Sequence, residues 1–141
     1  MIHVLDTDHL SILDQDSIEA FNLGRRLAAS AEADVVVSII TYEEQMRGWP
    51  AYLARANTPL KQIEAYAKLR RHVERFRCIP LLDYDEKAAT VYERLRQSRI
   101  RIGTKDLQIA AIAIANDAVL LTRNLSDFSK VPDLKAEDWS T

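Results

Sequence analysis

Acidic residues lie next to several short apolar segments of this 141-residue chain. Asp6 directly follows the apolar segment Ile2–Leu5. Other acids and one amide lie where further apolar segments meet candidate helices: Asp8, Glu43, Glu44, Asp106, Asn124 and Asp127. In open α/β sheets such positions meet at one edge, where strands end and helices begin. Three or four carboxylates within about 5 Å repel one another by several kcal/mol, unless a cation neutralises them or some take up protons. We therefore expect a divalent cation at this edge.

The residue types favour a hard cation. The chain has one cysteine, Cys78, and three histidines, too few for a disulfide framework, a Cys-based zinc site or a His-rich site. Carboxylate and water oxygens suit Mg²⁺ or Mn²⁺. Such an ion can activate a water against a phosphodiester and stabilise the charge that develops on the phosphate.

Most of these acids also have a structural explanation. The alternatives are a T-x-x-E capping box of Thr41 with Glu44, an N-cap role for Asp8, a cap at Thr104 beside Asp106, and a turn at Asp127. Asp6 differs, because a carboxylate at the end of a buried strand has neither a capping role nor easy solvation. Its burial therefore requires a partner.

The elements that position these residues follow from four nearly continuous apolar segments, Ile2–Leu5, Val35–Ile39, Cys78–Leu82 and Ala118–Thr122. Strands of this kind are covered on both faces, as in parallel sheets packed between helices. The length suits one domain. We therefore predict a single α/β domain over residues 1–141, with three α/β/α layers and a mostly parallel central sheet of four or five strands.

Capping signals predict where the intervening helices begin. Asp16 and Glu19 form a capping box for a helix that runs to about Ala31. Thr58 with Pro59 opens a long helix, and Asp83 with Glu86 caps the next. Residues 99–105 are long enough to bring the chain back to the carboxyl edge before a helix over 106–116. This return places Asp106 at the same edge as Asp6.

Composition and hydropathy exclude several classes. Lys and Arg number 19 against 21 Asp and Glu, a net charge of −2 without the basic footprint of a duplex DNA-binding protein. The longest apolar run, Ile109–Ala115, falls short of the roughly 18 residues that span a bilayer. Asp6 and Asp8 interrupt the N-terminus before a signal-like stretch forms. We therefore expect no membrane association and a reduced, cytoplasmic protein.

Four segments in this order resemble the PIN-domain ribonucleases, and most closely the VapC-type toxins of bacterial toxin–antitoxin systems. They are VLDTD at 4–8, SIITYEE at 38–44 with Gly48 beyond it, GTKDLQIA at 103–110 and LTRNLSDF at 121–128. The resemblance runs from residue 2 to about 139. It implies that Asp6, Glu44 and Asp106 bind Mg²⁺, for which Mn²⁺ substitutes, with the fourth position at Asn124 or Asp127. The step to Gly48 favours Glu44 over Glu43.

Two departures from the family pattern touch this site. Asn124 stands where the family often has an acid, so Asp127 is an alternative fourth carboxylate. Asp8 stands where many relatives have Asn, which adds a possible ligand or supporting residue. The resemblance further implies an endoribonuclease that cleaves structured RNA such as tRNA and inhibits translation, a VapB-like antitoxin partner, and a homodimer.

Two surfaces fit this reading. Basic residues expected near the same edge could steer RNA to the acids: Arg99, Arg101, Lys105, Arg123 and Lys130. An aromatic-rich stretch beside Glu44 offers a groove for an amphipathic segment or a second copy: Met46, Trp49, Pro50, Tyr52 and Leu53.

Two other functions stay open from the residues alone. The D-x-D pair of Asp6 and Asp8 fits a haloacid-dehalogenase-like phosphatase with Asp6 as nucleophile, although this leaves Glu44 unexplained. A non-enzymatic phosphoreceiver module would use Asp83 as the phosphate acceptor, but it gives Asp106 no task.

Overall fold

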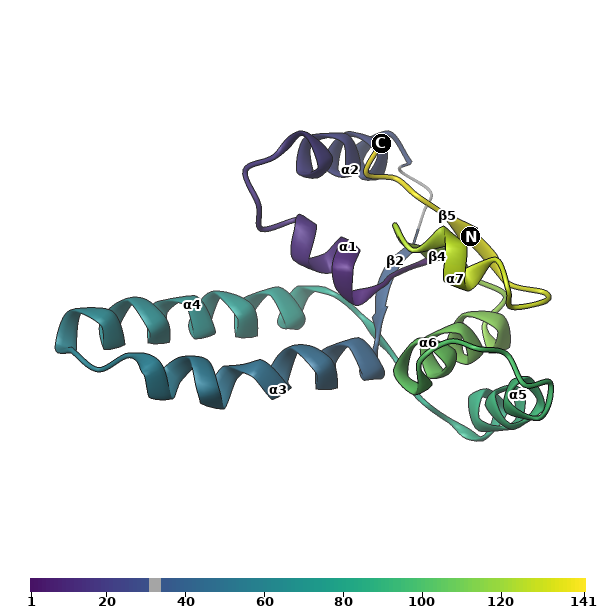
Figure 1. The fold of residues 1–141 in the computed structure, drawn as a ribbon. Coiled ribbons are helices and arrows are strands. Elements are labelled where there is room, and N and C mark those ends of the chain that lie inside the picture. Colours follow the sequence, from purple (N-terminus) through teal and green to yellow (C-terminus); the bar gives the residue numbers. More distant parts are fainter. Residues whose placement is uncertain (31–33) are drawn as a thin grey trace.

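The computed structural model describes residues 1–30 and 34–141. Its centre is a parallel sheet with the strand order β3-β2-β1-β4-β5. The strands are β1 (Ile2–Leu5), β2 (Asp34–Ser38), β3 (Leu81–Leu82), β4 (Val119–Leu121) and β5 (Lys135–Glu137). Helices pack on both faces of this sheet (Figure 1), so the predicted three-layer α/β fold is confirmed.

The helices form two groups on the sheet and a protruding pair (Figure 1). Their bounds are α1 (Thr7–Ile12), α2 (Ile18–Ala29), α3 (Ile39–Arg55), α4 (Pro59–Cys78), α5 (Glu86–Gln97), α6 (Thr104–Ala115) and α7 (Leu125–Phe128). Helices α5 and α6 pack closely together against one face, and α1 and α2 contribute to the core on the other.

Neighbouring strand residues alternate between two cores. Val4, Val36 and Leu120 belong to the core that includes α5 and α6. Leu5, Val37 and Leu121 belong to the core that includes α1, α2 and Trp139. Because successive side chains of a strand point to opposite faces, a strand buried on both faces must be apolar throughout. The continuous apolar pattern in the sequence has this origin.

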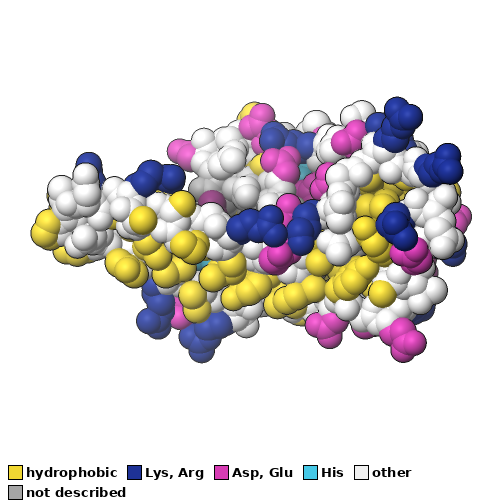
Figure 2. Space-filling model, turned by 60° about the horizontal axis from the view of Figure 1, so that its bottom comes forward, with side chains coloured by type: hydrophobic (Ala, Val, Ile, Leu, Met, Phe, Trp, Pro, Cys, Tyr) yellow, Lys and Arg dark blue, Asp and Glu magenta, His cyan; other side chains and the backbone are white. Residues whose placement is uncertain are grey.

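The long helices α3 and α4 extend away from the sheet as a hairpin (Figure 1). Hydrophobic side chains line one side of this hairpin and continue toward the body of the protein (Figure 2). On the N-terminal half of α4, Leu60, Ile63 and Tyr66 are exposed. An exposed apolar surface of this extent is typical of a contact with another molecule.

One strand prediction needs correction, and one strand was not predicted. Cys78 was expected to begin a strand, but it is the last residue of α4, and only Leu81 and Leu82 pair with β2. A short apolar run such as the one near Cys78 occurs both at the end of a helix and at the start of a strand. The pattern alone therefore does not distinguish the two elements. Strand β5 is polar and lies at the sheet edge next to β4, and no apolar segment signalled it.

Two helix starts are also corrected. Ser17, rather than Asp16, caps α2, since its hydroxyl accepts the N–H of Ala20 at 3.1 Å. Asp85, rather than Asp83, caps α5, since its Oδ1 accepts the N–H of Ala88 at 2.9 Å. The predicted end of the first of these helices, near residue 31, lies outside the described residues.

Other helix signals are confirmed. Thr58 caps α4 with Pro59 in its first turn. The segment after α5 returns the chain, so that α6 begins near the ends of β1 and β4, as predicted (Figure 1). No helix in residues 1–30 or 34–141 combines the length and the apolar character that crossing a membrane requires.

Candidate functional site

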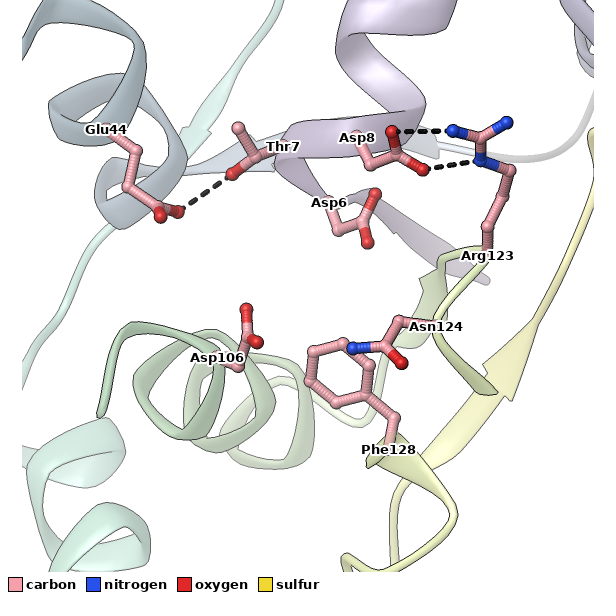
Figure 3. Close-up of a pocket in the computed structure, with 8 residues that line it drawn as sticks. All are labelled: Asp6, Thr7, Asp8, Glu44, Asp106, Arg123, Asn124 and Phe128. Atoms are coloured by element: carbon pink, nitrogen blue, oxygen red, sulfur yellow. Dashed lines mark hydrogen bonds and ion pairs between the residues drawn. The ribbon is translucent and has the colours of Figure 1, made fainter. Parts of the chain in front are cut away.

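A cavity of about 390 Å³ lies at the carboxyl edge of the sheet. Its lining comes from segments far apart in the sequence: Asp6, Thr7, Asp8, Glu44, Asp106, Arg123, Asn124 and Phe128 (Figure 3). Asp6 ends β1, Glu44 lies on the helix that follows β2, and Asp106 lies in the first turn of α6. The topology therefore brings together the three acids that the sequence singled out.

Asp6 is both buried and a helix cap. Its Oδ1 accepts the backbone N–H of His9 at 2.7 Å, which makes Asp6 the N-cap of α1. The expectation that Asp6 has no capping role was therefore wrong, and the alternative in which Asp8 caps this helix does not hold. Burial raises the pKa of Asp6 to about 6, although hydrogen bonds from His9 and Thr122 oppose the rise. The ionised carboxylate is thus short of stabilising partners.

Glu44 is held by a hydroxyl from another element. The Thr7 hydroxyl donates to Glu44 Oε1 at 2.8 Å, linking α1 to α3 (Figure 3). The expected capping box of Thr41 with Glu44 does not form, because Ser38 is the N-cap of α3 and accepts the N–H of Thr41 at 3.1 Å. Glu44 lies beyond the first turn, so capping does not explain its position.

Asp106 lies in the first turn of α6. The N-cap there is Gly103, which offers no side chain, and Thr104 is the first helical residue instead of the cap that the sequence allowed. Burial raises the pKa of Asp106, and the negative charges of Glu44 and Asp127 raise it further. This mutual repulsion is the physical mark of carboxylates that share one region without a cation.

Asp8 and Arg123 form an ion pair at the rim of the cavity. Arg123 Nε lies 2.6 Å from Asp8 Oδ2, and Nη2 lies 3.0 Å from Oδ1 (Figure 3). Such a two-point contact fixes the plane of the guanidinium. Arg123 is the only base among the described residues that line the cavity. It is therefore the one lining side chain placed to attract an anion.

The two candidates for a fourth ligand contact each other. Asn124 Nδ2 donates to Asp127 Oδ2 at 3.0 Å, and Lys130 lies 3.3 Å from Asp127 Oδ1. The Asn124 bond is the main reason why the pKa of Asp127 is lowered. Asn124 lines the cavity, whereas Asp127 does not. In this arrangement Asp127 holds the amide of Asn124 by accepting its N–H.

The donor atoms suit a hard cation, but the acidic side chains lie too far apart to bind one as they stand. In the described ranges, no three His, Cys, Asp or Glu side chains are close enough to form a metal site. Carboxylates are nevertheless the ligands that Mg²⁺ prefers, and Asp6 and Asp106 both carry charges that burial disfavours. The residues therefore fit such an ion if their side chains move inward on binding.

Several predicted neighbours lie outside the cavity lining. Lys105 Nζ pairs with Glu43 Oε1 at 2.5 Å, and Glu43 also pairs with Arg47. Lys105 and Glu43 therefore form ion pairs on the surface and not in the cavity. Arg99, Arg101 and Lys130 are exposed and do not line the cavity. Asp83, which the phosphoreceiver alternative requires, does not line it either.

The aromatic-rich stretch lies on the outer part of α3. Trp49 packs edge-on against Tyr52, with ring centroids 5.4 Å apart, and also against His72 of α4. These rings join the two helices of the hairpin. Trp49 and Tyr52 thus hold the hairpin together in addition to lining its surface.

Sequence reasoning missed two residues that support the acids. Thr7 supplies the hydroxyl to Glu44, and His9 lies beneath Asp6 with its ring fully buried. The only signal for His9 was its spacing, since the third residue after an N-cap contacts the capping side chain. The Thr7 contact joins two elements, so no local pattern reveals it.

The chain is similar to known proteins along most of its length. The family described as PIN domain matches residues 4–134. Ribonuclease VapC2 of Rickettsia felis is 27% identical over 143 residues, covering 99% of this chain and 98% of that protein. The tRNA(fMet)-specific endonuclease VapC of Salmonella typhimurium is 35% identical over 65 residues, covering 43% of this chain and 49% of that one. The solved structure of VapBC-1 from nontypeable Haemophilus influenzae gives a TM-score of 0.76 at 26% identity, covering 100% of both chains.

Proposed function

Because this chain belongs to the PIN-domain family, we propose that it is an endoribonuclease of the VapC type, the toxin of a toxin–antitoxin pair. The observation that carries the proposal is the convergence of Asp6, Glu44 and Asp106 on one cavity from three separate elements. The described residues that line that cavity include no lysine, which the phosphatase alternative requires.

The three carboxylates would hold Mg²⁺, with Mn²⁺ as a substitute and Asn124 or Asp127 at the fourth position. When bound, the ion supplies positive charge that offsets the acids and stabilises the charge developing on a phosphodiester. Thr7 orients Glu44, and one carboxylate of the set accepts a proton from the attacking water. Arg123, fixed by Asp8, holds the phosphate at the rim.

The substrate class we propose is structured RNA, with tRNA as the first candidate, and its cleavage would inhibit translation. The name of the Salmonella relative, a tRNA(fMet)-specific endonuclease, supports this choice. Acids around the cavity repel a phosphate backbone, so binding depends on local bases such as Arg123. A chain of net charge −2 with few bases at the cavity is then expected to bind RNA weakly. The affinity should fall only modestly with salt, because the salt dependence grows with the number of phosphates that bases neutralise.

The partner we propose is a VapB-like antitoxin. Support comes from the full-length similarity to the solved VapBC-1 structure. The exposed Leu60, Ile63 and Tyr66 of α4 offer an apolar surface that an amphipathic segment can cover. A homodimer and a cytoplasmic location remain predictions that follow from the family resemblance and the sequence.

Cleavage of bulk tRNA by the purified protein tests the activity. We expect cleavage with Mg²⁺ and none with EDTA. Glu44→Gln removes one charge from the cavity and should lower the rate by at least about 100-fold. The matched control is Glu43→Gln, since Glu43 is adjacent in sequence but bonds Lys105 and Arg47 on the surface.

Comparing the two variants separates a loss of cleavage specific to Glu44 from a general loss of activity. Glu43→Gln should cleave at close to the wild-type rate, because exposed ion pairs contribute little to stability. Equal rates for wild type and Glu44→Gln, or undiminished cleavage in EDTA, would refute the proposed site.

A further inference from the structure

The His9 ring lies between the cavity and the C-terminal segment. Its side chain is fully buried, directly behind Asp6. Nε2 accepts the backbone N–H of Trp139 at 3.3 Å. Nδ1 lies 3.7 Å from Asp6 Oδ1 and has no hydrogen-bond partner among the described residues.

These contacts select one tautomer of the ring. Because a backbone N–H donates to one of its two nitrogens, the imidazole is in a neutral form that carries a single proton. A nitrogen that accepts a hydrogen bond cannot also carry that proton. Because Nε2 accepts from Trp139, the proton lies on Nδ1, and the N–H faces Asp6 Oδ1.

The opposite tautomer is poorly supported by the surroundings. It would direct Nε2–H toward Asp138 Oδ1, 3.6 Å away. That oxygen already accepts the backbone N–H and the hydroxyl of Ser140, at 2.8 and 2.6 Å. The Trp139 N–H would also lose its acceptor, and a buried N–H without an acceptor is unfavourable.

The segment that sets the tautomer is anchored to α2. Arg26 lies over the Trp139 ring, 4.9 Å from its centroid, and donates to the backbone oxygen of Asp138 at 3.4 Å. Asn22 Nδ2 donates to the backbone oxygen of Ser140 at 3.1 Å. Trp139 is itself buried. The backbone N–H of Trp139 that donates to His9 Nε2 is therefore held in place by contacts with α2.

We propose that His9 is a positioning residue for Asp6, whose Nδ1–H fixes the rotation of the carboxylate toward the cavity and is itself oriented by the Trp139 backbone. The proposal rests on the proposed function, since it gives Asp6 its task. His9 already supplies its backbone N–H to the same oxygen at 2.7 Å. Closing the 3.7 Å ring contact by under an ångström gives Oδ1 a second donor. Together with the hydrogen bond from Thr122, this sets the direction of Oδ2.

Two substitutions of His9 separate the two ring contacts. The amide of asparagine occupies the place of Nδ1, so His9→Asn keeps a donor toward Asp6 and loses the Trp139 contact. The amide of glutamine reaches the place of Nε2, so His9→Gln keeps an acceptor for Trp139 and loses the donor. A merely structural role for His9 predicts that glutamine is the better replacement, whereas positioning of Asp6 predicts asparagine.

We expect His9→Gln to weaken Mg²⁺ binding, measured by calorimetry, and to lower kcat by about 10- to 100-fold with KM for tRNA unchanged. His9→Asn should recover most of both losses. The proposal is overturned if glutamine restores binding and kcat better than asparagine, or if the loss lies in KM alone.

A spectroscopic measurement keeps the proposal testable if either variant fails to fold. Long-range ¹H–¹⁵N spectra of the metal-free wild-type protein identify which ring nitrogen of each histidine carries the proton, and the chain has only three histidines. We expect the His9 proton on Nδ1. A proton on Nε2 overturns the positioning role, whereas wild-type protein that neither binds Mg²⁺ nor cleaves RNA refutes the proposed function instead.

Discussion

At the scale of single residues, Asp6 combines two demands that oppose each other. As the N-cap of α1 it needs only an oxygen, and asparagine serves equally well there. As a member of the acidic cavity it needs a charge, although its side chain is almost fully buried. The charge therefore lowers the stability of the protein in the absence of a cation.

This conflict predicts a pH-dependent gain in stability for Asp6→Asn. The pKa of Asp6 rises from 3.8 to about 6 on folding, so the folded state binds the proton more tightly. The unfolding free energy of the wild type then falls as pH increases from about 4 to about 6, by about 3 kcal/mol in total. At pH 7.5 in EDTA, Asp6→Asn should be more stable by up to this amount, and below pH 4 by almost nothing.

Urea denaturation of both proteins at pH 3.5 and pH 7.5 measures this difference. Mg²⁺ should stabilise the wild type at pH 7.5 and leave Asp6→Asn unaffected, because a ligand of the folded state alone raises its stability. A variant less stable than the wild type at pH 7.5 in EDTA would contradict the prediction.

The positions of the acids could be predicted from the sequence, but their local contacts could not. Asp6 and Asp106 were assigned to one edge because the end of a strand and the start of a helix are both visible locally. The capping role of Asp6 was missed because Asp8 offers the same chemistry two residues later. His9 escaped notice because its ring contacts Trp139, 130 positions away in sequence.

At the scale of elements, the start of α3 is tied to the cavity by hydroxyl groups. Ser38 Oγ donates to Thr41 Oγ1 at 3.4 Å, and Thr7 Oγ1 also reaches Thr41 Oγ1, at 3.3 Å. Thr7 in turn contacts Glu44. The cap of α3 thus belongs to the same hydrogen-bonded group as the acid that the helix carries.

Two capping substitutions test this coupling. Ser38→Ala removes a buried N-cap and should destabilise the protein by about 1–2 kcal/mol. It should also slow RNA cleavage roughly tenfold, because the Glu44 side chain loses part of its support. Thr58→Ala removes the exposed cap of α4 and should cost about 1 kcal/mol without slowing cleavage.

Thermal unfolding gives the stability of each variant, and initial rates of tRNA cleavage give the activity. Equal cleavage rates for the two variants would show that the start of α3 does not position Glu44.

Elements with strong apolar patterns were predictable, and polar ones were not. β1 was assigned with its observed bounds because both of its faces are covered. β5 was missed because Lys135–Glu137 has two exposed residues and pairs with one neighbour only. Such an edge strand forms through pairing with β4, a contact that no local pattern carries.

At the scale of the whole molecule, one sheet separates two cores and carries a protruding hairpin. The two cores share the strands β1, β2 and β4. Unfolding of these strands therefore disrupts the packing of both cores. The hairpin contributes few buried residues, but α3 begins directly at the end of β2 and Ile40 lies in a core. We therefore predict that hairpin and sheet unfold in one cooperative transition, as a single domain.

The two tryptophans report on opposite ends of this arrangement. Trp49 lies in the hairpin, and Trp139 is buried against α2 and the sheet. In the single-tryptophan variants Trp139→Phe and Trp49→Phe, fluorescence and far-UV circular dichroism should follow the same urea curve within each protein. A Trp49 signal that changes at lower urea than the circular dichroism would instead show that the hairpin unfolds alone. Such a hairpin would be stabilised mainly by whatever covers its exposed apolar side, so adding that partner should then raise the Trp49 midpoint selectively.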